Sequence, residues 1–103
     1  MILLRGNRNT HIAFLYEWIR GLEAGRLRVK ELEDDEDVDR VAVYTGEAFI
    51  RKGGLGQPDY DFPDGRILII FTFEGNAVAV SWVCPTHRGL ADTVLARLRE
   101  RFG

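Results

Sequence analysis

The stretch from Arg66 to Glu74 constrains the fold of this chain most, because its apolar residues fall on both faces of an extended strand. That pattern is typical of a central strand covered on both sides. Gly75-Asn76 follows and, since both residues tolerate positive φ, predicts a two-residue turn into a second strand over Ala77–Cys84. One face of the first strand carries Ile67, Ile69, Phe71 and Phe73, and the other carries Leu68 and Ile70.

Helical periodicity appears first near the N-terminus, from about Thr10 to Ala24, with Asn9 or Thr10 as the N-cap and Gly25 at the C-terminal end. Its apolar stripe consists of Ile12, Leu15, Ile19 and Leu22. Phe14 and Trp18 widen this stripe beyond that of a typical surface helix. Either loops or the N-terminal residues cover the extra side, or the two aromatic residues belong to a partner surface.

A second helix is predicted from about Arg88 to Phe102, with an apolar face formed by Leu90, Ala91, Val94, Leu95, Leu98 and Phe102. Leu27–Lys30 alternates like a half-solvated strand. Val41–Tyr44 and Glu47–Arg51 are predicted as two strands joined near Thr45-Gly46. We therefore expect an α+β fold: a single mainly antiparallel sheet of about five strands, with an N-terminal and a C-terminal helix packed on it, and residues 1–103 forming a single domain.

Size and composition narrow the class of protein further. A chain of 103 residues has material for one core. The longest apolar run, Ile67 to Phe71, is too short to cross a bilayer, and the N-terminus lacks the pattern of a secretory signal. Cys84 is the sole cysteine, so no disulfide forms within the chain. These features predict a cytoplasmic protein that does not associate with a membrane.

The formal net charge of −2 conceals an uneven distribution along the chain. Residues 1–30 carry a balance of +4, residues 31–64 a balance of −8, and residues 65–103 a balance of +2. Nucleic-acid binders usually have a basic surplus that neutralises phosphates. No such surplus exists here, so we expect no nucleic-acid partner.

The acidic character is concentrated between Glu31 and Asp39, where seven of nine residues are carboxylates. Such a segment is solvated, neutralised by a cation, or neutralised by a basic partner. Asp35-x-Asp37-x-Asp39 copies the start of an EF-hand calcium loop. The loop then has Arg40 where glycine is needed and Gly46 where a bidentate Glu is needed, so we expect no metal. A solvated turn between strands and a docking surface for a basic protein remain as the alternatives.

Arg51–Gly56 contains three glycines and looks like a phosphate cradle, which requires a helix directly after it. The following residues, Gln57–Gly65, have turn chemistry and three carboxylates instead. We therefore expect an inter-strand loop here. A loop of this length can also contact a partner, with Tyr60 as an aromatic contact.

Cys84 and His87 are three residues apart where the last strand meets the last helix. A cysteine nucleophile needs a base within hydrogen-bonding reach and a group that orients the base, and no acid lies nearby in sequence. Cys84 continues the alternation of Val78, Val80 and Trp82, so we predict a buried thiol at the end of a strand.

The segment Val83-Cys84-Pro85-Thr86-His87-Arg88-Gly89-Leu90-Ala91 resembles the acetyl-CoA loop of GCN5-related N-acetyltransferases, where Val-x-Pro-x-x-Arg-Gly follows a strand and opens a helix. The resemblance covers these residues and not the whole chain. It implies an acyl-CoA-binding domain in which Arg88 and Gly89 hold the cofactor. Where the family has further glycines, this chain has Ala91 and Thr93.

No set of acid, base, nucleophile and electrostatic stabiliser can be assembled from these residues. Our leading hypothesis is a small non-enzymatic interaction protein, of the inhibitor, immunity or regulatory type, without a cofactor. Its partner would be a larger protein with a basic surface, and a homo-oligomer is compatible with the same features. The predicted contact residues are Glu33, Asp34, Asp35, Glu36 and Asp37, with Trp18 and Tyr60 as aromatic anchors.

Overall fold

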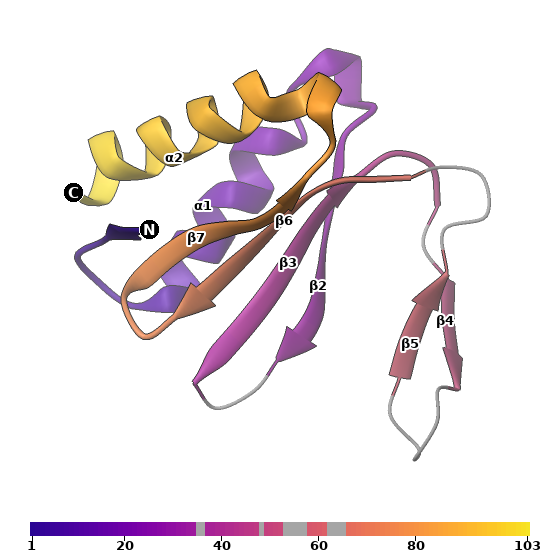
Figure 1. The fold of residues 1–103 in the computed structure, drawn as a ribbon, viewed down its shortest axis with the longest axis horizontal. Helices are drawn as coiled ribbons and strands as arrows, with labels where there is room; N and C mark the ends of the chain where they lie inside the picture. Colours follow the sequence, from indigo (N-terminus) through magenta and orange to yellow (C-terminus); the bar gives the residue numbers. More distant parts are fainter. Residues whose placement is uncertain (35–36, 48, 53–57, 62–65) are drawn as a thin grey trace.

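Five antiparallel strands and two helices form the main body of the protein (Figure 1). The computed structural model describes residues 1–34, 37–47, 49–52, 58–61 and 66–103. The sheet has the order β1-β7-β6-β3-β2, and both helices lie on the same side of it. The α+β class with an N-terminal and a C-terminal helix on one sheet is confirmed. The elements are β1 (Ile2–Leu3), α1 (Arg8–Ile19), β2 (Arg28–Asp34), β3 (Val38–Tyr44), β6 (Ile67–Glu74), β7 (Ala77–Val83) and α2 (Arg88–Phe102).

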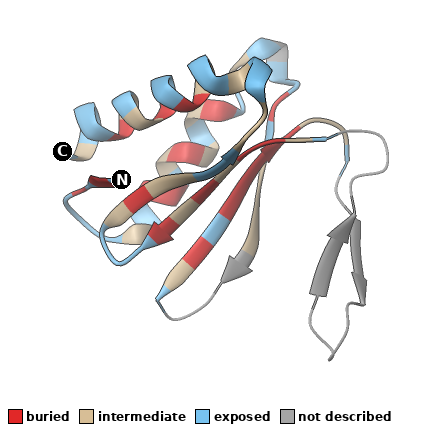
Figure 2. Cartoon of the chain, viewed as in Figure 1, coloured by how far each residue is buried: buried red, intermediate tan, exposed pale blue. Residues whose placement is uncertain are grey.

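The predicted central strand, β6, is the middle strand of the sheet, between β3 and β7. Ile69, Phe71 and Phe73 are buried in the core that the sheet shares with the two helices (Figure 2). Ile70 and Thr72 alternate with them on the opposite face and are half-buried. Both described helices lie on the other face, which answers a question that the sequence left open.

The turn at Gly75-Asn76 joins β6 to β7 as predicted, with Gly75 at a φ of 60°. The alternation expected along β7 fails further on, because the register shifts between Ile70 and Phe71. Phe71 pairs with Val80 and Ile70 with Trp82, which leaves Ser81 as the extra residue of a bulge. Trp82 therefore falls on the face without helices and is 47% exposed.

Helix α1 begins and ends earlier than the sequence predicted. Its N-cap is Asn7, whose side-chain oxygen accepts a hydrogen bond from the Thr10 amide at 2.9 Å. The helix ends at Ile19, and the chain then forms the short 3-10 helix η1 (Glu23–Gly25). Gly25 has the positive φ expected of it, 79°, but it closes η1 and not α1.

Helix α2 covers the aromatic edge of α1. Phe14 meets the ring of Phe102 edge-on, with 5.5 Å between the ring centroids. The Arg97 guanidinium lies 5.7 Å from the centroid of the Trp18 ring. Both Phe14 and Trp18 are half-buried and pack against the core. The extra apolar side is thus covered by α2, where the sequence suggested loops, N-terminal residues or a partner surface.

Most of the strand predicted at Glu47–Arg51 exists, but its predicted pairing was wrong. Glu47–Arg51 does not pair with Val41–Tyr44: β4 (Phe49–Lys52) pairs with β5 (Pro58–Asp61) in a separate two-stranded sheet. Part of the predicted loop is therefore strand, and residues 53–57 and 62–65 lie outside the described residues. The fifth strand of the main sheet is β1, which pairs with β7 through Ile2 and Val78.

Of the helices that the structure describes, none is long and apolar enough to cross a membrane.

A buried ion pair connects the first turn of α1 to β3. Arg8 Nε lies 2.7 Å from Asp39 Oδ2, and the Asp39 side chain is 3% exposed. Asp39 pairs across the sheet with Phe73, in register with the core-facing residues of β6. Removing the cation from such a pair leaves a carboxylate in a poorly solvated place, which is costly.

We expect Arg8→Met to lower the free energy of unfolding by about 2–4 kcal/mol, measured by urea denaturation, because Asp39 would lose its cation. Arg8→Met combined with Asp39→Leu should recover a large part of that loss. Arg20→Met is the control, since Arg20 and Glu17 form an exposed pair, and it should cost under about 0.5 kcal/mol. If Arg8→Met behaved like this control, the buried pair would not matter to stability.

Candidate functional site

The run of carboxylates at residues 31–39 divides into two groups. Glu31 is half-buried and Asp39 is buried against Arg8, so both belong to the body of the sheet. Asp37 is exposed at the bend that precedes β3. Glu33 and Asp34 are the last described residues of β2, and their side chains are outside the description, as are Asp35 and Glu36 altogether. The predicted contact residues 33–37 thus begin within the last two residues of β2 and end directly before β3.

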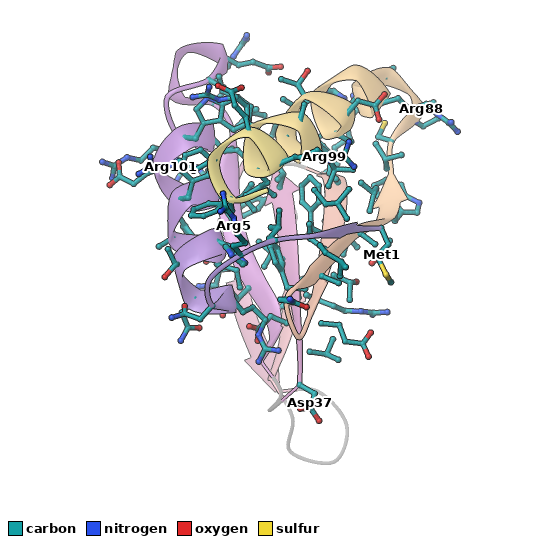
Figure 3. All side chains as sticks on the ribbon, turned by 90° about the vertical axis from the view of Figure 1, so that its left-hand side faces the viewer. Met1, Arg5, Asp37, Arg88, Arg99 and Arg101 are labelled. Carbon is teal, nitrogen blue, oxygen red and sulfur yellow. The ribbon has the colours of Figure 1, made fainter. Side chains whose placement is uncertain are left out.

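Both sides of this acidic end are attached to the sheet. Glu33 pairs with Arg40 and Asp34 with Asp39 across β2 and β3, after a register shift between Glu31 and Glu33. The carbonyl oxygen of Asp37 accepts a hydrogen bond from the Gly75 amide at 3.3 Å, which ties the bend to the β6–β7 turn. Figure 3 shows Asp37 at the end of the molecule far from Arg88.

The third acid of the calcium-like spacing is paired with a cation of the protein itself. Asp39, the third acid of that spacing, lies within β3 and binds Arg8. Across the ranges that the model describes, no group of three or more His, Cys, Asp or Glu side chains could hold a metal ion.

Of the two predicted aromatic anchors, the structure describes the side chain of Trp18 alone. Trp18 is near the C-terminal end of α1, ten residues after Arg8 and thus about 15 Å along the helix from the buried ion pair. Its ring is packed against the core beneath Arg97. Tyr60 is in β5 and pairs with Ile50 in the separate hairpin, and its side chain is outside the description.

Arg88 and Gly89, the positions implied by the acyltransferase resemblance, open α2 directly after the short 3-10 helix η3 (Pro85–His87). The side chain of Arg88 is exposed and extends away from the body (Figure 3). A Cβ added to Gly89 would meet no atom within 4 Å, so packing does not require glycine there. The N-cap, His87, makes no side-chain capping bond.

A chain of hydrogen bonds links Cys84 to His87 through Thr86. The Thr86 hydroxyl lies 3.3 Å from the Cys84 sulfur and 2.9 Å from Nδ1 of His87. Hydrogen bonds from the Thr86 side chain and backbone lower the pKa of Cys84 below its usual value, desolvation opposes them, and the charge of Arg66 adds to the lowering. When the hydroxyl gives its only proton to the sulfur, Nδ1 of His87 must be the donor in the second bond.

The structure therefore corrects the prediction of a buried thiol, since Cys84 is half-buried. The bulge at Ser81 breaks the alternation on which that prediction depended. Sequence reasoning also missed Arg8, the partner of Asp39, and Thr86, the link between Cys84 and His87. A threonine within two residues of a cysteine was the one signal available for the second contact, whereas nothing in the sequence connects residues 8 and 39.

We expect Cys84 to react with iodoacetamide at lower pH than an ordinary thiol, because the thiolate is the reactive form. Thr86→Val should raise the pKa of Cys84 toward that of an ordinary thiol and slow alkylation at neutral pH. The rate measured against pH gives the comparison. Thr93→Val is the control, since the Thr93 hydroxyl donates to the Gly89 carbonyl and contacts no thiol. Identical profiles for wild type and Thr86→Val would contradict the assignment.

Comparison of the chain with protein-family models, with curated proteins and with solved structures found no match in any of the three. The acidic end of the sheet is the part where the charge is most concentrated in sequence, and it is attached to the sheet on both sides.

Proposed function

We propose that this protein is a small non-enzymatic interaction protein, of the inhibitor, immunity or regulatory type, which docks a basic surface of a larger protein through residues 33–37. The observation that supports it most is the setting of Asp37. Its side chain is exposed while its carbonyl oxygen binds the Gly75 amide and the strand after it contains the buried Asp39.

Attachment of the acidic segment to the sheet favours binding, because ordering a flexible segment when a partner binds costs free energy. The acidic segment leaves β2 at Asp34 and enters β3 at Val38, and these strands pair up to Asp34 and Asp39. The ends of the segment are therefore held a strand spacing apart, about 5 Å. The five carboxylates of residues 33–37 produce a local negative field that accelerates encounter with a basic surface.

The acidic residues alone carry this proposal. Trp18 is left out of the contact because its ring packs under Arg97 and lies about 15 Å along α1 from the Arg8 end. Tyr60 stays a prediction, since its side chain is outside the description. The partner is a protein whose contact surface is rich in lysine and arginine.

Affinity capture from the native host with three baits tests the proposal. The baits are the wild-type protein, a variant with Asp34, Asp35 and Asp37 changed to lysine, and a control with Glu17, Asp92 and Glu100 changed to lysine, which has the same net charge. We expect a protein that wild type and control retain and the first variant loses. Its association rate with wild type should exceed that with the variant by at least about tenfold at low salt.

Salt supplies the second criterion of this prediction. Raising ionic strength should reduce the difference between wild type and variant, because exposed charges are screened within about 8 Å at physiological salt. Partners that bind all three baits equally, or a wild-type affinity that does not depend on salt, would exclude the acidic end as the docking site. The interaction-protein proposal would then lose its support.

An acyl-CoA-binding domain is the second candidate, favoured by the order of elements around residues 83–91. Strand β7 leads through η3 into α2, whose first residues are Arg88 and Gly89, and the resemblance implies this strand–loop–helix order. We expect acetyl-CoA at millimolar concentration to raise the midpoint of thermal unfolding if this candidate is correct. Gly89→Leu should abolish the rise. An unchanged midpoint would end this candidate and leave the first untouched.

A further inference from the structure

At the end of the sheet opposite Asp37, an open cleft of about 540 Å³ is lined by three arginines. Arg26 follows η1, Arg28 begins β2, and Arg66 directly precedes β6. Arg26 and Arg28 come from the same connection, between η1 and β2, whereas Arg66 comes from a distant part of the sequence. Their convergence on one cleft is a consequence of the fold.

Backbone contacts fix two of these arginines relative to each other. Arg28 is the cross-strand partner of Tyr44 at the end of β3. Thr45, the next residue, donates its amide to the Arg66 carbonyl at 3.1 Å, and its hydroxyl accepts from the Arg66 amide at 3.4 Å. The starts of β2 and β6 are thus held on either side of the end of β3.

The charges of these arginines are not balanced by ion pairs. Elsewhere Arg8, Arg20 and Arg97 each contact a carboxylate. Within the described ranges, no carboxylate lies at ion-pair distance from Arg26, Arg28 or Arg66. Like charges brought together in this way repel, and an anion between them would relieve the repulsion.

We propose that this cleft binds the phosphate group of a small organic phosphate. Guanidinium groups pair with phosphate through two parallel hydrogen bonds, and the tetrahedral group accepts donors from several directions at once. Thr45 and His87 also line the cleft and supply a hydroxyl and an imidazole. A volume of about 540 Å³ exceeds what one phosphate fills and suits a small-molecule ligand.

Two carboxylates, Glu23 and Glu47, line the same cleft. They limit how much negative charge the ligand can carry, and they accept hydrogen bonds from hydroxyl or amino groups on the remainder of the molecule. Their presence disfavours a polyanion and favours a single phosphate on an otherwise neutral body. Neutralising either glutamate should therefore strengthen phosphate binding, whereas neutralising the arginines should weaken it.

Titration with inorganic phosphate, followed by amide NMR spectra at constant ionic strength, tests the site. We expect saturable shifts for Thr45, Arg66 and His87, and none for residues at the Asp37 end. Arg28→Gln with Arg66→Gln should weaken phosphate binding by about fivefold or more, and Glu47→Gln should strengthen it by about twofold. Arg99→Gln, at an exposed position near the other end of α2, removes a charge outside the cleft and should leave the affinity unchanged.

Several outcomes would overturn the proposal: shifts that do not saturate or are spread over the surface, equal loss in Arg99→Gln, or no gain in Glu47→Gln. If the double arginine variant does not fold, Glu47→Gln still tests the proposal, because it is expected to strengthen phosphate binding. Acetate and a phosphorylated sugar distinguish the chemistry, because tighter binding of acetate than of phosphate would exclude a phosphate site. The lysine variant of the acidic end should bind phosphate normally, so this proposal and the docking proposal fail separately.

Discussion

The contact between Arg8 and Asp39 is the constraint on which the arrangement of this protein depends. It connects the first turn of α1 to β3, a strand flanked on both sides in the sheet. A buried carboxylate must have a cation or hydrogen bonds nearby, since desolvation of a lone charge is costly. The pair therefore fixes the N-terminal end of α1 over the strand that leads out of the acidic segment. The same contact that positions the helix holds the base of the proposed docking site.

Sequence patterns predicted the parts of the fold that local physics determines. The apolar residues of Arg66–Glu74 and the turn at Gly75-Asn76 identify the central hairpin, because periodicity and positive φ are properties of neighbouring residues. The short strand β1 could not be found in this way. Two residues, Ile2 and Leu3, carry no periodicity, and they are strand only because β7 offers them an edge. The hairpin of β4 and β5 was missed because turn residues at Gln57–Gly65 suggested a loop.

The errors at the candidate sites have the same origin. Asp39 looked like one more acid of a solvated run, yet its strand register turns it into the core beside Phe73 and toward Arg8. Trp82 looked buried by alternation, yet the bulge at Ser81 moves it to the face without helices. Neither the register of a strand nor the position of a bulge is specified by the residues of that strand alone. Strand register and bulge position are both set by packing across the sheet, and the pattern of residues along one strand carries no information about that packing.

The charge distribution in space is simpler than the distribution in sequence. Glu33, Asp34 and Asp37 lie at one end of the sheet, and Arg26, Arg28 and Arg66 line a cleft at the other. Strand β3 runs between the two ends and spans seven residues, or about 20 Å. That separation is more than twice the screening length at physiological salt, about 8 Å, so the two ends do not neutralise each other within one molecule. Each must be balanced by solvent ions or by a ligand of its own, and the distance allows a basic protein and a phosphate to be bound at the same time without contact. A protein of 103 residues can therefore present two independent binding surfaces, provided that the sheet between them stays rigid.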